Sequence, residues 1–122
     1  MTVGAGGDDR VAAVAALADI TALADAIRDG RRAVPAVVTT PPGLMAAGGI
    51  GWIRELAAAL AARPETAGCR LVVDCGSDAA RAHMLAASGL ADPVIETSPA
   101  VLTTLCAAAA PETRVRTPRD PL

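Results

Sequence analysis

The sequence predicts a small α/β domain with a parallel sheet of four to five strands, built from repeated strand–helix units. Short runs rich in β-branched residues alternate with alanine-rich runs of helical length. The clearest strand-like runs, 36–40 and 70–75, are apolar until they end in polar residues, a pattern typical of strands covered on both faces. Strands and helices that alternate in this way form right-handed crossovers and a parallel sheet. Both a flavodoxin-like sheet and half of a β/α barrel fit this order.

The length of 122 residues is typical of one domain. We expect a disordered segment over 1–9, the α/β domain over 10–117 and a C-terminal tail over 118–122. The amino terminus lacks the basic and apolar regions of a signal peptide, and no apolar run approaches the ~20 residues that span a bilayer. These observations predict a soluble, cytoplasmic protein with no membrane partner.

The amino-terminal third permits two interpretations. In the first, residues 11–29 form one long alanine-rich helix. In the second, 11–17 is a strand, Asp19 caps a helix that runs through Arg28, and Gly30 ends it. The second interpretation continues the strand–helix alternation and gives Asp19 a capping role.

Further elements are expected downstream of the first clear strand. Ser77 or Asp78 is suited to cap a helix that Gly89 ends. Pro111 closes the helix after it. The predicted helices are 51–63, 77–88 and 99–110, and the predicted strands are 93–97 and 113–116.

Absent residue types exclude several chemistries. The chain contains no Lys, Tyr or Phe, and it has one His, one Trp and three Cys. Without lysine there is no Schiff-base catalysis, no pyridoxal phosphate attachment and no Walker phosphate loop. One histidine and dispersed cysteines exclude a standard structural zinc site. A net charge of −2, dispersed arginines and the near absence of aromatic side chains argue against nucleic-acid binding.

The core must consist of small aliphatic side chains, each of which buries little area. We therefore expect a homo-oligomer, with a dimer favoured, that buries a further face of the protein. A helical wheel of 77–88 points His83 toward the core. The same wheel places Leu85 near the polar face, where a partner subunit would cover it.

Polar residues that follow the predicted strands mark a candidate site. In parallel α/β folds, ligands bind outside the carboxyl ends of the strands. Thr40, Asp74 and Glu96 each lie at the end of a predicted strand, so they are expected to meet at one edge of the sheet. The other expected ligand-binding residues lie in the adjoining turns: Gly49, Ile50, Gly51, Gly76, Ser77 and Ser98.

Different functions fit these residues. The glycine segment leads into a helix, whose first N–H groups would bind an anionic small molecule. Alternatively, Asp74 and Glu96 are the catalytic pair of a lyase or hydrolase, with a shared divalent cation, acting on a phosphorylated or carboxylated metabolite. A third alternative is a non-catalytic protein-interaction domain. Either ligand site requires the glycine segment and both carboxylates to surround one pocket. If these residues have no functional role, Asp74 holds the loop in place, and the glycines form a flexible turn that lets the next helix pack against the sheet.

Cys69 and Cys75 lie six residues apart on one predicted strand, about 20 Å at ~3.3 Å per residue. This separation is too long for a disulfide or a shared metal, so reduced thiols are expected. Because Cys75 lies at the expected mouth of the site, it is predicted to react fastest with a bulky alkylating reagent.

Three short motifs carry a resemblance to other proteins. The chain has a P-P-G turn at 41–43, a G-x-G-W helix start at 49–52 and a D-C-G turn at 74–76. With these motifs, residues 34–90 resemble a group of small uncharacterised bacterial single-domain α/β proteins. The resemblance implies the α/β fold and lends no activity and no catalytic residue.

Overall fold

A computed structural model describes residues 10–41 and 43–120, apart from the side chains of 44–47. The segment predicted to be disordered, 1–9, lies outside the described residues. The strands are β1 (Val11–Ala13), β2 (Val37–Thr39), β3 (Arg70–Asp74) and β4 (Asp92–Val94). The helices are α1 (Leu17–Arg28), α2 (Leu44–Ala61), α3 (Ala79–Ser88) and α4 (Pro99–Ala108). The strands form one all-parallel sheet in alternation with the helices, which confirms the predicted α/β fold.

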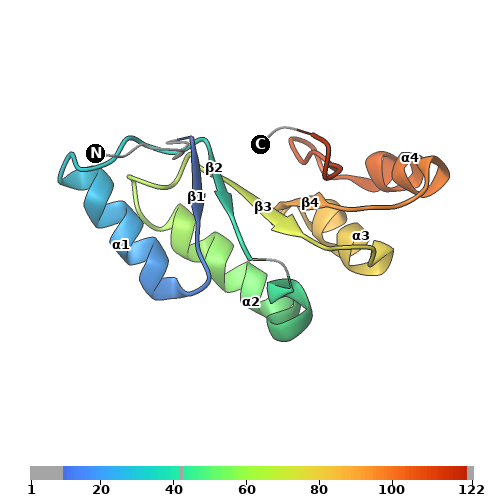
Figure 1. Ribbon diagram of the computed structural model, residues 1–122, viewed down its shortest axis with the longest axis horizontal. Helices are drawn as coiled ribbons and strands as arrows, with labels where there is room; N and C mark the ends of the chain where they lie inside the picture. The colour runs from blue at the N-terminus through green and yellow to red at the C-terminus, as the bar shows by residue number, and fades with distance from the viewer. Residues whose placement is uncertain (1–9, 42, 121–122) are drawn as a thin grey trace.

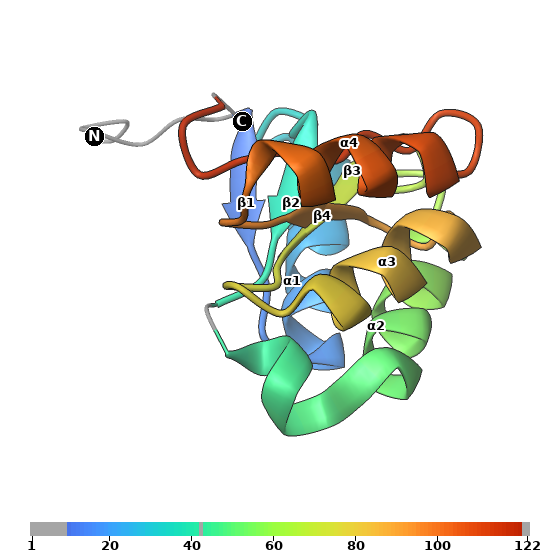
Figure 2. The same ribbon diagram turned by 90° about the vertical axis from the view of Figure 1, so that its right-hand side faces the viewer.

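The strand order places the connecting helices on one face of the sheet. Each strand pairs with the next strand in the chain, in the order β1-β2-β3-β4. Right-handed crossovers in such a sequential sheet carry every helix to the same side. Figure 1 shows α1, α2 and α3 together below the sheet, and Figure 2 shows α4 beside α3. The order is that of half a β/α barrel, whereas in a flavodoxin-like sheet the first strand lies between later ones.

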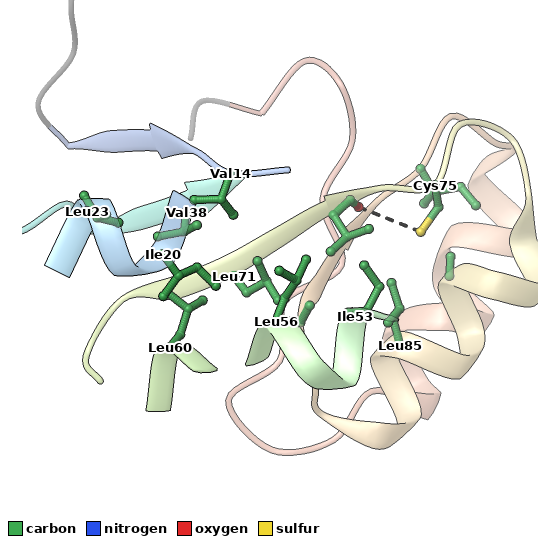
Figure 3. Close-up of a cluster of buried hydrophobic side chains, with 14 of the residues drawn as sticks. Val14, Ile20, Leu23, Val38, Ile53, Leu56, Leu60, Leu71, Cys75 and Leu85 are labelled. Atoms are coloured by element: carbon green, nitrogen blue, oxygen red, sulfur yellow. Dashed lines mark hydrogen bonds between the residues drawn. The ribbon is translucent and has the colours of Figure 1, made fainter. Parts of the chain in front are cut away.

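The hydrophobic core lies between the sheet and these helices (Figure 3). Its buried side chains include Val38, Leu71, Ile20, Leu56 and Leu85. Alternate strand positions point to the opposite face, which no described helix covers. Val37 and Val72 on that face are nevertheless buried (6% and 2% exposed), so these strands are covered on both faces as predicted, on one of them without a helix.

Helix α3 presents a different face to the core from the one predicted. Leu85 is completely buried with Ala82 and Ala86, whereas His83 is exposed. Both assignments from the helical wheel are wrong, because alanines occur on all sides of this helix and do not mark its buried stripe. Residues of the same chain bury Leu85, so a partner subunit is not needed to cover it.

The amino-terminal third follows the strand–helix interpretation, with earlier boundaries. The strand ends at Ala13, and α1 begins at Leu17 rather than after Asp19. Asp19 stabilises the start of the helix from within its first turn, because its Oδ2 accepts the N–H groups of Ala15 and Ala16 at 2.8 and 3.1 Å.

Helix α2 begins at Leu44, before the predicted start at Gly51, and it is kinked at Gly49. The kink has φ 70° and ψ −175°, which glycine adopts without strain. A Cβ atom at Gly48 would lie 2.8 Å from Cβ of Trp52, so a glycine there lets the chain approach the indole. The glycine segment is therefore part of a kinked helix and not the turn before one.

The later elements keep their predicted order; α3 ends at the predicted residue 88, and the others end earlier. Asp78, rather than Ser77, caps α3, and Gly89 ends it with a left-handed φ of 73°. The last predicted strand is reduced to one parallel bridge between Val94 and Arg116. None of the described helices is long and apolar enough to cross a membrane.

Candidate functional site

A cavity of about 350 Å³ lies at the carboxyl ends of β2, β3 and β4. We call it the sheet-end cavity. Strand residues form one side of it, and the chain after Arg116 forms the other. Its lining consists of Thr39, Thr40, Val72, Asp74, Val94, Thr117, Pro118 and Asp120. This edge of a parallel sheet is where ligands bind in α/β folds, and the lining includes the predicted Thr40 and Asp74.

Backbone hydrogen bonds orient the two carboxylates of the sheet-end cavity. Oδ1 of Asp74 accepts the N–H of Gly76 at 2.8 Å, and Oδ2 of Asp120 accepts the N–H of Thr117 at 2.9 Å. The second oxygen of each carboxylate has no hydrogen bond among the described residues, and neither group forms an ion pair there. Asp74 thus has the loop-fixing role and still presents a free oxygen.

Thr40 is the buried polar residue of the lining. It is 7% exposed, and its Oγ1 is buried with no hydrogen-bond partner among the described residues. A buried hydroxyl left without a partner costs about 1–3 kcal/mol.

Glu96 lines a different cavity, of about 420 Å³, together with Thr97 and Arg119. The register of the sheet explains the separation. Asp74 pairs with Val94, so Glu96 lies two residues beyond it, where its N–H donates to the carbonyl of Gly76 at 2.8 Å. Among the described residues, the linings of the two cavities have Thr117 and Pro118 in common, which form a wall between them.

The other predicted ligand-binding residues do not join the two carboxylates. The segment 49–51 belongs to the kink of α2, and neither lining includes it. Gly76 holds the strand-end aspartate, Ser77 is exposed, and Ser98 caps α4. Thr40 and Asp74 line one cavity and Glu96 lines the neighbouring one, and a single pocket that contains all the predicted residues stays a prediction.

Asp92, at the start of β4, is a buried anion that the sequence reasoning missed. It is 1% exposed, and its carboxylate accepts hydrogen bonds from Nε of Arg70 at 2.8 Å and from Nη2 of Arg116 at 3.0 Å. The backbone N–H of Arg114 adds a third at 2.9 Å. Burial alone would raise the pKa of Asp92, but the hydrogen bonds from Arg70, Arg114 and Arg116 outweigh it and lower that pKa. Asp92 is therefore held as a charged group.

The contacts of Asp92 tie the C-terminal segment to the sheet. Arg116 donates its N–H to the carbonyl of Pro93, and its own carbonyl accepts the N–H of Ile95, both at 2.9 Å. The chain then continues into Thr117, Pro118 and Asp120, which line the sheet-end cavity. A residue at the opposite end of β4 thus positions one wall of the cavity.

The three cysteines are free thiols with different exposure: Cys75 is buried, Cys69 is half-buried and Cys106 is exposed. The side chain of Cys75 points into the core, with Sγ 3.8 Å from the carbonyl of Val73 (Figure 3). Burial, reinforced by the charges of Asp74 and Asp78, raises the pKa of Cys75 to about 11. This burial argues against the predicted high reactivity of Cys75, because side chains alternate along β3 and Cys75 falls on the helix side.

We expect Cys106 to be alkylated first and Cys75 last when the native protein is treated with N-ethylmaleimide at neutral pH. Peptide mapping by mass spectrometry over time measures the order, and the unfolded protein, in which all three thiols are exposed, is the control. Labelling of Cys75 before Cys106 would contradict the placement of Cys75 in the core.

No protein-family model matches the chain, and neither a curated protein nor a solved structure matches it. The geometry of the sheet-end cavity is therefore the basis for assigning a function.

Proposed function

We propose that this chain is a small α/β module that binds a small molecule in the sheet-end cavity. The observation that carries the proposal is the combination of an apolar floor with oriented polar groups at the strand ends. Val72 and Val94 supply the floor, while Asp74 and Asp120 are held in place by backbone N–H groups. Ligand sites typically combine an apolar surface with a few fixed polar groups in this way.

The catalytic alternative, a lyase or hydrolase using Asp74 and Glu96, has less support. The two side chains line different cavities, so a shared proton or cation is not favoured. Binding without catalysis needs only the groups that the sheet-end cavity contains. The cytoplasmic location and the homodimer stay predictions. Leu85 no longer supports the dimer, because it is buried within its own chain, and the small side chains of the core are the remaining argument.

Saturation-transfer NMR with a library of amine-, hydroxyl- and carboxylate-bearing fragments tests the proposal. We expect fragments that bind the wild type and no longer bind a Thr39→Tyr variant, because a tyrosine at this strand position would fill the cavity. Thr104→Tyr, on the exposed side of α4, is the matched control and should keep the same binding fragments. Native mass spectrometry of the purified protein shows in addition whether a ligand is retained. If no fragment binds, or Thr39→Tyr binds the same fragments as the wild type, the proposed function is wrong.

A further inference from the structure

We propose that the ligand of the sheet-end cavity is a small organic cation, a protonated amine on a short aliphatic or hydroxylated body. This inference rests on the proposed function and assigns its ligand class. The cavity contains two carboxylates, Asp74 and Asp120, and no arginine or histidine among its described lining residues. A cation is the ligand whose charge this lining complements.

The arginines that lie in the C-terminal segment or contact it form no ion pair with Asp74 or Asp120 among the described residues. Arg70 and Arg116 both bind Asp92, which compensates the charge of that carboxylate. Arg119 lines the second cavity, on the other side of the wall that contains Pro118. The negative charges of Asp74 and Asp120 are therefore not compensated by an ion pair among the described residues.

The hydrogen-bonding groups of the cavity favour a donor. Asp74 and Asp120 each have one carboxylate oxygen without a described hydrogen bond, and these oxygens only accept. An ammonium group has three N–H donors and no acceptor, and its hydrogen bonds to carboxylates are about twice as strong as neutral ones. A bound anion would instead be repelled by both carboxylates. The N–H groups of a helix start, which were predicted to bind the anion, are also missing from this cavity, because its described lining does not include the segment 49–51.

The remaining lining sets the body of the ligand. Val72, Val94 and Pro118 offer apolar surface, which suits a short carbon chain. Thr39 lies beside them, and Thr40 has a buried hydroxyl with no described partner. A hydroxyl on the ligand would donate to the hydroxyl oxygen of Thr39, whose own proton is donated to the carbonyl of Ala12. Among the described residues no group of three His, Cys, Asp or Glu side chains could hold a metal ion.

Three compounds test this class: aminobutanol, butanediol and hydroxybutyrate. Each has a four-carbon chain with a hydroxyl, and the second group is an amine, a hydroxyl or a carboxylate, respectively. Each is titrated at neutral pH and low salt into the full chain, and two-dimensional amide NMR spectra report where it binds. We expect aminobutanol to shift the amide signals of Thr39, Asp74 and Thr117 and to bind at least about tenfold more tightly than the other two. Added salt should weaken its binding.

Asp74→Asn and Asp120→Asn should each weaken aminobutanol binding about tenfold. Glu55→Gln, which removes the same charge from an exposed position on α2, is the matched control and should leave the affinity unchanged. Equal or tighter binding of butanediol or hydroxybutyrate at the same amides overturns the cationic class and leaves the proposed function in place. Larger shifts of these amides with magnesium chloride overturn it in favour of a metal site. If none of these compounds binds, but some fragments bind the wild type and not Thr39→Tyr, only the ligand class is wrong. If no fragment binds either, the proposed function is wrong as well.

Discussion

Replacing Asp92 by asparagine is expected to lower the free energy of unfolding by about 3 kcal/mol, because it removes the charge that pairs two arginines. Arg116 is the costlier of the two to leave unpaired, since its side chain is 10% exposed, compared with 33% for Arg70. The midpoint of urea unfolding, measured by circular dichroism, gives the loss. Asp29→Asn is the matched control, because Asp29 pairs with Arg28 and Arg31 on the surface and should change the stability by less than about 1 kcal/mol. Equal effects of the two substitutions would contradict the structural role of Asp92.

The pH dependence of the wild type tests the same residue without a variant. The pKa of Asp92 is lowered in the folded state, so its contribution to stability is complete above the ordinary aspartate value of about 3.9. That contribution is lost as the pH falls through the pKa of the folded state. We therefore expect the difference in unfolding free energy between the wild type and Asp92→Asn to be constant near neutral pH and to shrink below about pH 4. A difference that persists unchanged below that pH would mean that the charge of Asp92 is not what stabilises the fold.

Leu85→Ala is expected to destabilise the protein by about 2–5 kcal/mol, because Leu85 is completely buried and its removal leaves a cavity between α3 and the sheet. The adjacent residue supplies the control. Met84 is 45% exposed on the same helix, so Met84→Ala should cost less than about 1 kcal/mol. Thermal unfolding monitored by circular dichroism compares the two variants.

The opposite order, with Met84→Ala the more destabilising, would restore the orientation of α3 that the helical wheel predicted. If Leu85→Ala does not fold, the conservative Leu85→Met replacement makes the same comparison, because a volume-conserving change in the core should cost less than about 1.5 kcal/mol. A Leu85→Met variant that also failed to fold would still place Leu85 in the core, since an exposed position tolerates either side chain.

The sequence by itself determined the α/β class, the order of the elements and the edge of the sheet where a site would form. These features depend on local chemistry. Apolar runs of β-branched residues favour strands, Asp78 and Ser98 cap the helices that follow them, and Gly89 permits the left-handed turn that ends α3. The site edge follows from topology alone, because the carboxyl ends of parallel strands meet at one edge.

Only the tertiary structure decided which groups meet at that edge. Asp74 and Glu96 both follow strands, but the register pairs Asp74 with Val94 and places Glu96 in another cavity. Register depends on how neighbouring strands pair, and the sequence of each strand by itself does not specify that pairing. The sequential strand order likewise left one face without a described helix, which no local pattern indicates.

The same distinction explains the residues that the sequence reasoning assigned wrongly or missed. Arg116 binds the buried Asp92 from 24 residues away in the sequence, so this pairing becomes evident only when the chain is folded. In α3, alanines fit the core and the surface equally well, so the buried stripe is decided by what the helix packs against. Local propensity therefore determined the elements of this protein, and long-range packing, pairing and charge compensation determined which groups line the sheet-end cavity.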